Sequence, residues 1–303
     1  WTTTPWTLIA NVALCVNPDE EYVKVESMGY KFILAHALCD KVLGEDYNVL
    51  ETFKGIDLEN TEYEQLMPFL KPEGKAFYVT CDNYVTMEDG TGVVHIAPAY
   101  GADDNNVCRK YNIPMLNPVD LSGCYTEGPW KGRHVTDSEL EIEIIKWLKE
   151  NDKLFKKIKI SHNYPHCWRC KSPLIYMAKP AWYIKVSEYR DKMVEANKQV
   201  NWYPDYVGEK RFGNWLLNAQ DWGISRSRYW GCPIPLWTCE CGHMEMIGSI
   251  DELVNKSIEK IDHDIDLHKP YVDNVHIKCE KCGKAMNRIP DVIDVWFDSG
   301  AVP

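Results

Sequence analysis

Residues 90–104 read GTGVVHIAPAYGADD, and this stretch combines a turn, a strand, a loop and the start of a helix. Two glycines flank the turn, and VVHIAP has the β-branched residues of a strand. Gly101 then precedes Asp103 and Asp104, which are residues favoured at helix N-termini, so DDNNVCRKY is predicted to be helical. Taken alone, the stretch is most simply a strand joined to a helix. A functional interpretation needs support from other residues.

The sequence around this stretch alternates short apolar runs with turn signals. ANVALCVNP, EYVKVES and KAFYVTCDNYV are typical of strands. YKFILAHALCDKVLG, residues 30–44, has helical spacing and ends at Gly44, so a helix is predicted there. A second helix is predicted over 136–150, where capping residues precede an amphipathic run. KLFKKIKIS, residues 153–161, alternates like a strand.

The composition is that of a globular protein with about two domains. Of 303 residues, 45% are apolar and 26% charged, and no apolar run approaches the roughly 20 residues of a membrane span. We therefore expect a cytoplasmic protein with no membrane partner. The net charge of −11 argues against a protein that coats nucleic-acid phosphates with Lys and Arg, so any nucleic acid must be held locally. Because residue 1 is Trp, we interpret the chain as a piece of a longer protein.

Twelve cysteines occur, and several form close pairs. Such pairs in a chain without a signal peptide favour zinc and a reducing compartment over disulfides. We predict a structural zinc ion held by two of these pairs, Cys239 with Cys241 and Cys279 with Cys282. Another CxxC pair occurs at Cys167 and Cys170. The remaining cysteines are predicted to be buried thiols: Cys15, Cys39, Cys81, Cys108, Cys124 and Cys232.

The first residues, WTTTPWTL, contain four short hydroxyl side chains, those of Thr2, Thr3, Thr4 and Thr7. Such hydroxyls can position a water molecule or a sugar hydroxyl. The simpler interpretation of these threonines alone is a β-branched strand.

Five segments together resemble successive segments of the isoleucyl-tRNA synthetases of class I. They are WTTTPWTLIANVAL, GTGVVHIAPAYGADD, HNYPHCWRCKSPLIY, DWGISRSRYWGCPIPLW and DVIDVWFDSG, in that order along essentially the whole chain. TTTP matches the isoleucyl version, since the valyl and leucyl enzymes have a motif closer to TTRP. Five motifs in the same order make a chance match very improbable.

The resemblance implies a mixed α/β chain in three parts. Residues 1–160 would form a strand-rich, β-barrel-like editing domain with surrounding helices. Residues 161–220 would form a return segment with a CxxC knuckle. Residues 221–303 would begin the second half of a Rossmann-type nucleotide-binding catalytic domain, with a cysteine-rich, zinc-binding insertion.

The function that this resemblance implies is proofreading. Isoleucine and valine differ by one methylene, worth roughly 1 to 3 kcal/mol in an apolar pocket, a limit for which isoleucyl-tRNA synthetase is the standard example. A second pocket that admits valine, rejects isoleucine and hydrolyses what enters corrects the resulting errors. We therefore expect tRNA-dependent hydrolysis of misactivated or mischarged valine.

The resemblance also implies roles for individual residues. Asp104 matches a carboxylate that holds the α-ammonium of the misattached amino acid, and its helix N-terminus should keep it ionised. His95 matches a residue that blocks the larger side chain, whereas without the resemblance it could equally be a strand histidine bonded to backbone. The residues expected around the terminal adenosine and the attacking water are Thr2, Thr3, Thr4, Thr7 and Asn11. No Ser-His-Asp set is evident, so we expect direct attack by water.

The cofactors and partners follow from the same resemblance. The CxC pair departs from the family's CxxC, so His243 is an alternative zinc ligand, and Cys167 and Cys170 resemble half of a site whose partners would precede Trp1. ATP and Mg²⁺ would serve only the full-length enzyme, because neither an HIGH nor a KMSKS-like signature occurs here. The expected partners are the aminoacylated 3′ end of tRNA for isoleucine, the valine and isoleucine moieties, and the rest of the synthetase. The alternative is a non-catalytic, zinc-stabilised tRNA-docking module of a valyl or leucyl enzyme.

Overall fold

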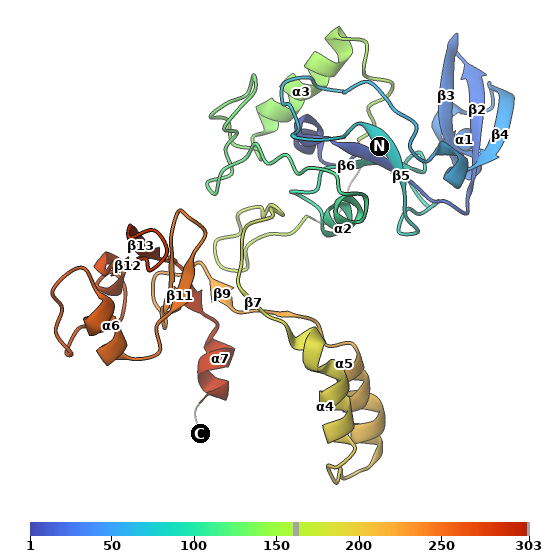
Figure 1. The fold of residues 1–303 in the computed structure, drawn as a ribbon. Coiled ribbons are helices and arrows are strands. Elements are labelled where there is room, and N and C mark those ends of the chain that lie inside the picture. The colour runs from blue at the N-terminus through green and yellow to red at the C-terminus, as the bar shows by residue number, and fades with distance from the viewer. Residues whose placement is uncertain (160–163, 302–303) are drawn as a thin grey trace. The chain divides into compact units, whose positions relative to one another are not determined.

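The computed structural model describes residues 1–159 and 164–301, which fall into two compact units (Figure 1). The units are Trp1–Lys179 and Pro180–Pro303, so the division lies inside the predicted return segment 161–220. Helices and strands occur in both units, which confirms a mixed α/β chain. Among the helices described, none has both the length and the apolar character that crossing a membrane requires.

The first unit contains a three-stranded sheet with β1 (Ala13–Val16) at its centre. β1 pairs in parallel with β5 (Tyr78–Cys81) and antiparallel with β6 (Val93–Ile96). Its sequence ALCV is apolar throughout because both faces are covered: Ala13 and Cys15 pack in one core, and Leu14 and Val16 pack in another. This register places Leu14 opposite His95. The strands predicted at these positions are confirmed.

A second three-stranded sheet consists of β2 (Glu21–Ser27), β3 (Tyr30–Ala35) and β4 (Asn48–Lys54). The helix predicted over 30–44 is therefore wrong for its first six residues. Met28 and Gly29 have φ values of 50° and 80°, which form a tight hairpin turn, and β3 then pairs with β2 from Tyr22 to Ser27. Pairing with a neighbouring strand outweighs the helical spacing of this segment.

Only the second half of that segment is helical, as η2 (His36–Leu38) followed by α1 (Cys39–Leu43). Gly44 ends the helix with φ of 79°, as predicted. The Ala35 N–H donates to the Thr91 carbonyl at 2.9 Å and so joins β3 to the loop before β6. The two sheets remain separate sheets, so the strand-rich character is confirmed but the described strands do not close into a barrel.

Helices α2 (Ala102–Tyr111) and α3 (Ser138–Glu150) match the two other helices predicted in this unit. The Asp137 side chain caps α3 by accepting a hydrogen bond from Glu139 N–H at 2.9 Å. Three buried residues of α3 pack with Leu8 and Ile9 of η1 (Pro5–Ala10). α2 packs instead against β1 and β6 through Val107 and Cys108. The chain's first residues are therefore held between two cores.

Residues 153–159 do not form the predicted strand, and residues 160–161 of that prediction lie outside the described residues. The alternation in this stretch has no strand partner. Its lysines bind carbonyl oxygens instead: Lys153 Nζ donates to Gln65 O at 3.1 Å and to Leu66 O at 3.0 Å. Lys156 Nζ donates to Val42 O at 3.1 Å.

The described residues of the second unit form short strands and short helices. Its first part comprises β7 (Tyr183–Ile184), η4 (Val186–Tyr189), α4 (Arg190–Asn197), the π-helix η5 (Val207–Phe212), α5 (Gly213–Leu217), β8 (Trp222–Gly223) and β9 (Ser225–Arg226). Its second part comprises β10 (Leu236–Thr238), β11 (Met244–Met246), α6 (Ile250–Lys256), η6 (Val272–Asn274), β12 (Ile277–Lys278), β13 (Ala285–Arg288), β14 (Val292–Ile293) and α7 (Val295–Gly300).

The strand pairs described in this unit are all antiparallel. A four-stranded sheet in the order β11-β10-β13-β12 has Cys239 directly after β10 and Cys279 directly after β12. The 3-10 helix η3 (Gly55–Leu58) belongs to the first unit. A Rossmann-type domain requires parallel strands, so that part of the fold prediction is not confirmed by the described residues.

Candidate active site and metal centre

The N-terminal threonines form a turn that leads into η1. Thr4 precedes Pro5, whose ring favours the first position of a helix, and the Thr4 carbonyl accepts from the Thr7 N–H at 3.0 Å. The Thr4 N–H donates to Thr2 Oγ1 at 3.1 Å, and the hydroxyl oxygens of Thr2 and Thr4 lie 3.4 Å apart. Thr3 is exposed. These residues are therefore a hydroxyl-bearing turn, and the simpler interpretation as a strand is wrong.

His95 lies on β6 between two of the predicted site residues. Its Nε2 is 2.8 Å from Thr7 Oγ1, and its Nδ1 is 3.2 Å from Asn11 Nδ2. Desolvation lowers the pKa of His95 to about 3. The ring is therefore neutral at physiological pH, and both of its nitrogens are engaged with side chains rather than with backbone.

Asp104 lies in the first turn of α2, which begins six residues after β6 ends at Ile96. Its Oδ2 accepts a hydrogen bond from Ala97 N–H at 2.9 Å, and Ala97 is two residues beyond His95. Burial raises the pKa of the Asp104 carboxyl above its ordinary value, although the Ala97 N–H opposes this shift. The sequence predicts that the helix N-terminus keeps Asp104 ionised. In the structure, burial has the largest effect on the pKa of this carboxyl and acts in the opposite direction.

Within residues 1–159 and 164–301, no cationic side chain forms an ion pair with the Asp104 carboxylate. Among the ion pairs of the described residues, none includes Asp104, whereas Asp103 in the same turn is exposed to solvent. A half-buried carboxylate without a positive partner carries a desolvation cost that a bound cation would relieve. The structure thus brings Thr2, Thr4, Thr7 and His95 together and places an unpaired anion at the end of the same strand.

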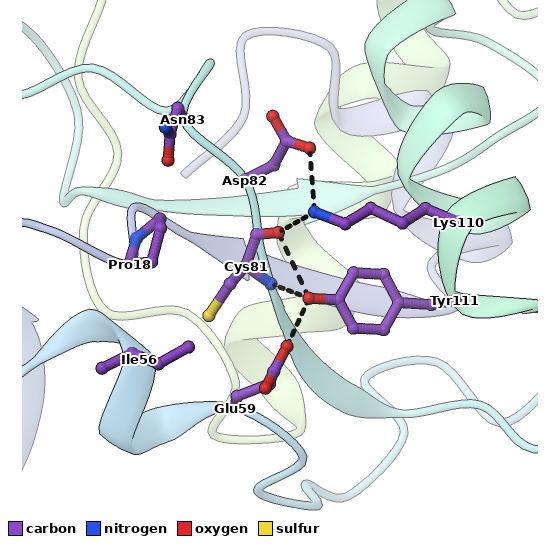
Figure 2. A pocket seen from close by; sticks show the side chains of 8 residues that line it. All are labelled: Pro18, Ile56, Glu59, Cys81, Asp82, Asn83, Lys110 and Tyr111. Carbon is purple, nitrogen blue, oxygen red and sulfur yellow. Dashed lines mark hydrogen bonds and ion pairs between the residues drawn. The ribbon is translucent and has the colours of Figure 1, made fainter.

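A separate cavity of about 350 Å³ in the first unit contains none of the predicted site residues (Figure 2). Its polar groups are paired with one another: Tyr111 Oη donates to Glu59 Oε1 at 2.5 Å, and Lys110 Nζ donates to Cys81 O at 3.2 Å. Lys110 also lies 3.6 Å from Asp82. Since these contacts satisfy one another, they give no sign of a catalytic site. The lining residues are Pro18, Ile56, Glu59, Cys81, Asp82, Asn83, Lys110 and Tyr111.

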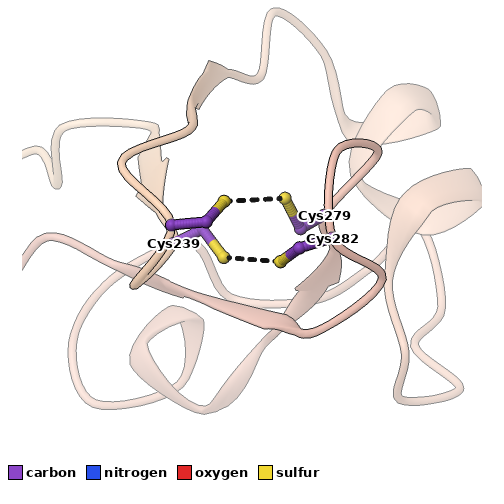
Figure 3. Close-up of side chains that lie close together, drawn as sticks. Cys239, Cys279 and Cys282 are labelled. Carbon is purple, nitrogen blue, oxygen red and sulfur yellow. Dashed lines mark hydrogen bonds between the residues drawn. The ribbon is translucent and has the colours of Figure 1, made fainter.

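The four predicted zinc ligands meet in the second unit (Figure 3). Their sulfur atoms all lie within 4.8 Å of one another. Cys239 Sγ is 3.3 Å from Cys282 Sγ, and Cys241 Sγ is 3.7 Å from Cys279 Sγ. A tetrahedral zinc with bonds of about 2.3 Å separates its sulfurs by about 3.8 Å, so the cluster fits a metal ion. His243 is not part of the cluster; its carbonyl oxygen accepts from Cys239 N–H at 2.9 Å.

The turn that contains Cys167 and Cys170 in the first unit has the same backbone hydrogen bonds as the turn that contains Cys279 and Cys282. In the cluster, Cys279 N–H donates to Lys284 O at 2.8 Å, and Gly283 N–H donates to Cys279 O at 2.9 Å. The same two bonds recur around Cys167. Its N–H donates to Ser172 O at 2.8 Å, and its carbonyl oxygen accepts from Lys171 N–H at 2.9 Å. Lys171 even adopts the left-handed φ of 62° that Gly283 adopts at 74°. Cys167 and Cys170 therefore have the backbone of a metal knuckle.

The other cysteines follow the prediction only in part. Cys15, Cys39, Cys81 and Cys108 are buried, whereas Cys124 is partly exposed and Cys232 is exposed. Burial raises the pKa of the Cys15 thiol to about 11, which keeps it protonated and unreactive.

Comparison with known proteins decides the family. A family model described as tRNA synthetases class I (I, L, M and V) matches residues 3–303. The chain belongs to this family. This chain is 52% identical over 305 residues to the isoleucine–tRNA ligase of Clostridium novyi. It is 48% identical over 302 residues to that of Picrophilus torridus.

These matches cover 100% and 99% of the chain but 29% of each relative, so this synthetase chain spans less than a third of the curated relatives' length. Among solved structures, it resembles the editing domain of the P. knowlesi cytosolic leucyl-tRNA synthetase at 14% identity, with a TM-score of 0.40. That match covers 50% of this chain and 80% of the other.

One residue at the site carries no sequence signal. Tyr63 Oη donates to Asn11 Oδ1 at 2.6 Å, although Tyr63 lies in an irregular segment outside every motif. Tertiary contacts alone bring it to the site, so neither periodicity nor spacing could have identified it.

Proposed function

We propose that this synthetase chain removes valine from tRNA for isoleucine by hydrolysis. The observation that carries the proposal is Asp104, a half-buried carboxylate for which the described part of the chain offers no cationic partner. It lies next to a strand whose His95 is surrounded by hydroxyl and amide side chains. An aminoacyl ester carries a free α-ammonium, which is the cation that such a carboxylate would bind. The isoleucine–tRNA ligases to which the chain is similar support the choice of substrate.

In this proposal the Asp104 carboxylate anchors the ammonium, and the ester carbonyl then lies toward the threonine turn. A water molecule positioned by the hydroxyls of Thr2, Thr3 and Thr4 attacks the carbonyl carbon. The bond to the ribose oxygen of the tRNA breaks, that oxygen takes up a proton, and free valine leaves. An ester needs little activation, so orientation and hydrogen bonding supply the catalysis.

His95 acts as a wall of the pocket. Its neutral, hydrogen-bonded ring has a fixed place, and isoleucine's extra methylene would collide with it. The net charge of −11 suits a domain that admits only the single-stranded 3′ end of tRNA, since few phosphates then approach the protein. The proposed setting is the cytoplasm, where charged tRNA is present.

In the second unit, Cys239, Cys241, Cys279 and Cys282 would hold a structural zinc ion. The ion would tie the turn after β10 to the turn after β12 and would take no part in hydrolysis. Residues 221–303 would complete a nucleotide-binding domain only with the further chain that longer relatives possess, where ATP and Mg²⁺ would serve the ligation of isoleucine.

The test is a deacylation assay on the 303-residue chain with valyl and isoleucyl esters of tRNA for isoleucine. The wild type should cleave the valyl ester and spare the isoleucyl ester. Asp104→Ala should lose activity by about 100-fold or more, because a charge-assisted contact at a buried site is worth several kcal/mol.

Asp103→Ala is the matched control, because it removes an exposed carboxylate from the same turn and should stay near wild type. Equal cleavage of both esters would contradict the proposal. So would equal activity of the two alanine variants, and a chain that binds tRNA without cleaving either ester would instead be a docking module.

A further inference from the structure

Both donor hydrogens of the Asn11 amide, and its oxygen, are engaged in hydrogen bonds inside the protein. Asn11 is only 4% exposed. Its Nδ2 donates to Ala13 O at 2.9 Å and contacts His95 Nδ1 at 3.2 Å, while its Oδ1 accepts from Tyr63 Oη at 2.6 Å. An amide nitrogen has two hydrogens, and both are accounted for. No donor of this side chain remains for a substrate.

The orientation of this amide is fixed by its backbone partner. The Ala13 carbonyl can only accept, so the nitrogen and not the oxygen of the Asn11 amide must face it. The opposite orientation would bring two oxygens to 2.9 Å and would leave the Tyr63 hydroxyl against an amide nitrogen. The assignment therefore follows from the chemistry of the neighbours.

The direction of every other bond follows from this orientation. Because Asn11 Nδ2 is a donor, His95 Nδ1 must accept, and the proton of the neutral ring is then on Nε2. The Nε2–H donates to Thr7 Oγ1 at 2.8 Å. The Thr7 hydroxyl in turn donates to Thr4 O at 2.9 Å. A single chain of donors thus runs from Tyr63 through Asn11, His95 and Thr7 to the threonine turn.

The Tyr63 hydroxyl is held in place at the far end of this chain. Tyr63 N–H donates to Phe77 O at 2.9 Å, and the Tyr63 ring packs edge to face on the Phe77 ring, with centroids 6.1 Å apart. Phe77 N–H donates to Val12 O at 2.7 Å, and Val12 is the residue after Asn11. The backbone that carries Tyr63 is therefore tied directly to the backbone that carries Asn11.

We propose that Asn11 and Tyr63 are positioning residues that hold His95 in one tautomer, with the proton on Nε2, and that neither residue contacts the substrate. His95 then has no free lone pair in its ring plane, because Asn11 occupies that of Nδ1. It cannot act as the general base for the attacking water and serves as an oriented, neutral wall. The role of His95 as a wall rests on the proposed function. The tautomer rests only on the hydrogen bonds of Asn11 and Tyr63.

The decisive measurement is the ¹⁵N NMR spectrum of the His95 imidazole in the 303-residue chain. We expect a protonated Nε2 and an unprotonated Nδ1 at pH 7, unchanged down to about pH 5. In Asn11→Asp the carboxylate can only accept, so the proton should move to Nδ1. In the wild type, a ring with its proton on Nδ1 or a charged ring at pH 7 would overturn the proposal. So would a spectrum that Asn11→Asp leaves unchanged.

Tyr63→Phe tests the outer end of the chain. Removing the hydroxyl leaves Asn11 Oδ1 without its donor, so valyl-ester cleavage should fall about 5-fold or more, and the His95 signals should broaden. Tyr84→Phe is the matched control, because the buried Tyr84 hydroxyl makes no hydrogen bond to a nitrogen or oxygen atom of the described residues. Equal effects of the two variants would overturn the role of Tyr63.

The two failures can be told apart. A chain with the expected tautomer that cleaves neither ester would refute the proposed function and leave the positioning network intact. A chain that cleaves the valyl ester selectively but holds the opposite tautomer would refute the network alone.

Discussion

The site on β6 and the cysteine cluster are each assembled from separate stretches of the chain, but in different ways. The cluster joins two turns 38 to 43 residues apart, and each turn already has its shape from local hydrogen bonds and a left-handed residue. The contacts of His95 reach across 84 to 88 residues to side chains on other elements. Short-range spacing therefore specifies the cluster, whereas the site exists only when the whole first unit is folded.

The largest effect that separates the two regions should come from the metal. We expect elemental analysis to find one zinc per chain, and Cys279→Ser to lose it and to destabilise the second unit by several kcal/mol, because metal binding contributes directly to folding. Cys232→Ser, which changes an exposed cysteine outside the cluster, is the control.

Deacylation should survive in the metal-free protein, because the first unit contains the whole of the proposed site. Loss of valyl-ester cleavage together with zinc would show that the two regions are not independent. Absence of any metal from the wild type would mean that the four thiols are merely packed together.

His95→Ala tests the wall with a smaller effect. Removing the ring should allow the isoleucyl ester to enter, and the ratio of valyl to isoleucyl cleavage should fall by about 10-fold or more, since one methylene is worth that much in a fitted pocket. The ratio of kcat/KM values for the two esters measures this. Full discrimination in the variant would exclude His95 as the wall.

The pH dependence of cleavage gives the smallest of these effects. Asp104 must be ionised to bind an ammonium, and burial raises its pKa above the ordinary 3.8. Cleavage should therefore begin to fall, by about 10-fold per pH unit, at a higher pH than an exposed aspartate would give. An acid limb at or below 3.8 would contradict this.

The same shift has a consequence for stability. Because the raised pKa favours the protonated carboxyl, the ionised form costs stability at neutral pH, and this cost disappears below the pKa of the unfolded chain. Asp104→Asn should accordingly raise Tm at pH 7 and lose that advantage at acidic pH. Thermal unfolding at several pH values measures the difference.

Helices with local start signals could be predicted from the sequence. Predictions were wrong where the structure of a segment depends on whether a strand partner is present. The helix from Ala102 and the cap at Asp137 were visible because each depends on neighbouring residues. Residues 30–35 have helical spacing but pair with β2, and 153–159 alternate without a strand partner. No local rule distinguishes these cases, since tertiary pairing overrides propensity.

The candidate site shows the same limit. Asp104, His95 and the threonines could be named from motifs that resemble a family. The sequence could not show that the donors of Asn11 are used inside the protein, or that Tyr63 reaches its oxygen from a segment without any pattern. Hydrogen-bond direction depends on which neighbours accept and donate, and only the folded chain shows those neighbours.

The most direct test of the central claim is a crystal structure of the chain with a non-hydrolysable analogue of the valylated 3′-terminal adenosine. We expect the amino nitrogen of the analogue within about 3 Å of the Asp104 carboxylate, and the valine methyl groups against the His95 ring. An amino nitrogen bound elsewhere, with Asp104 still paired only to the Ala97 N–H, would contradict the account.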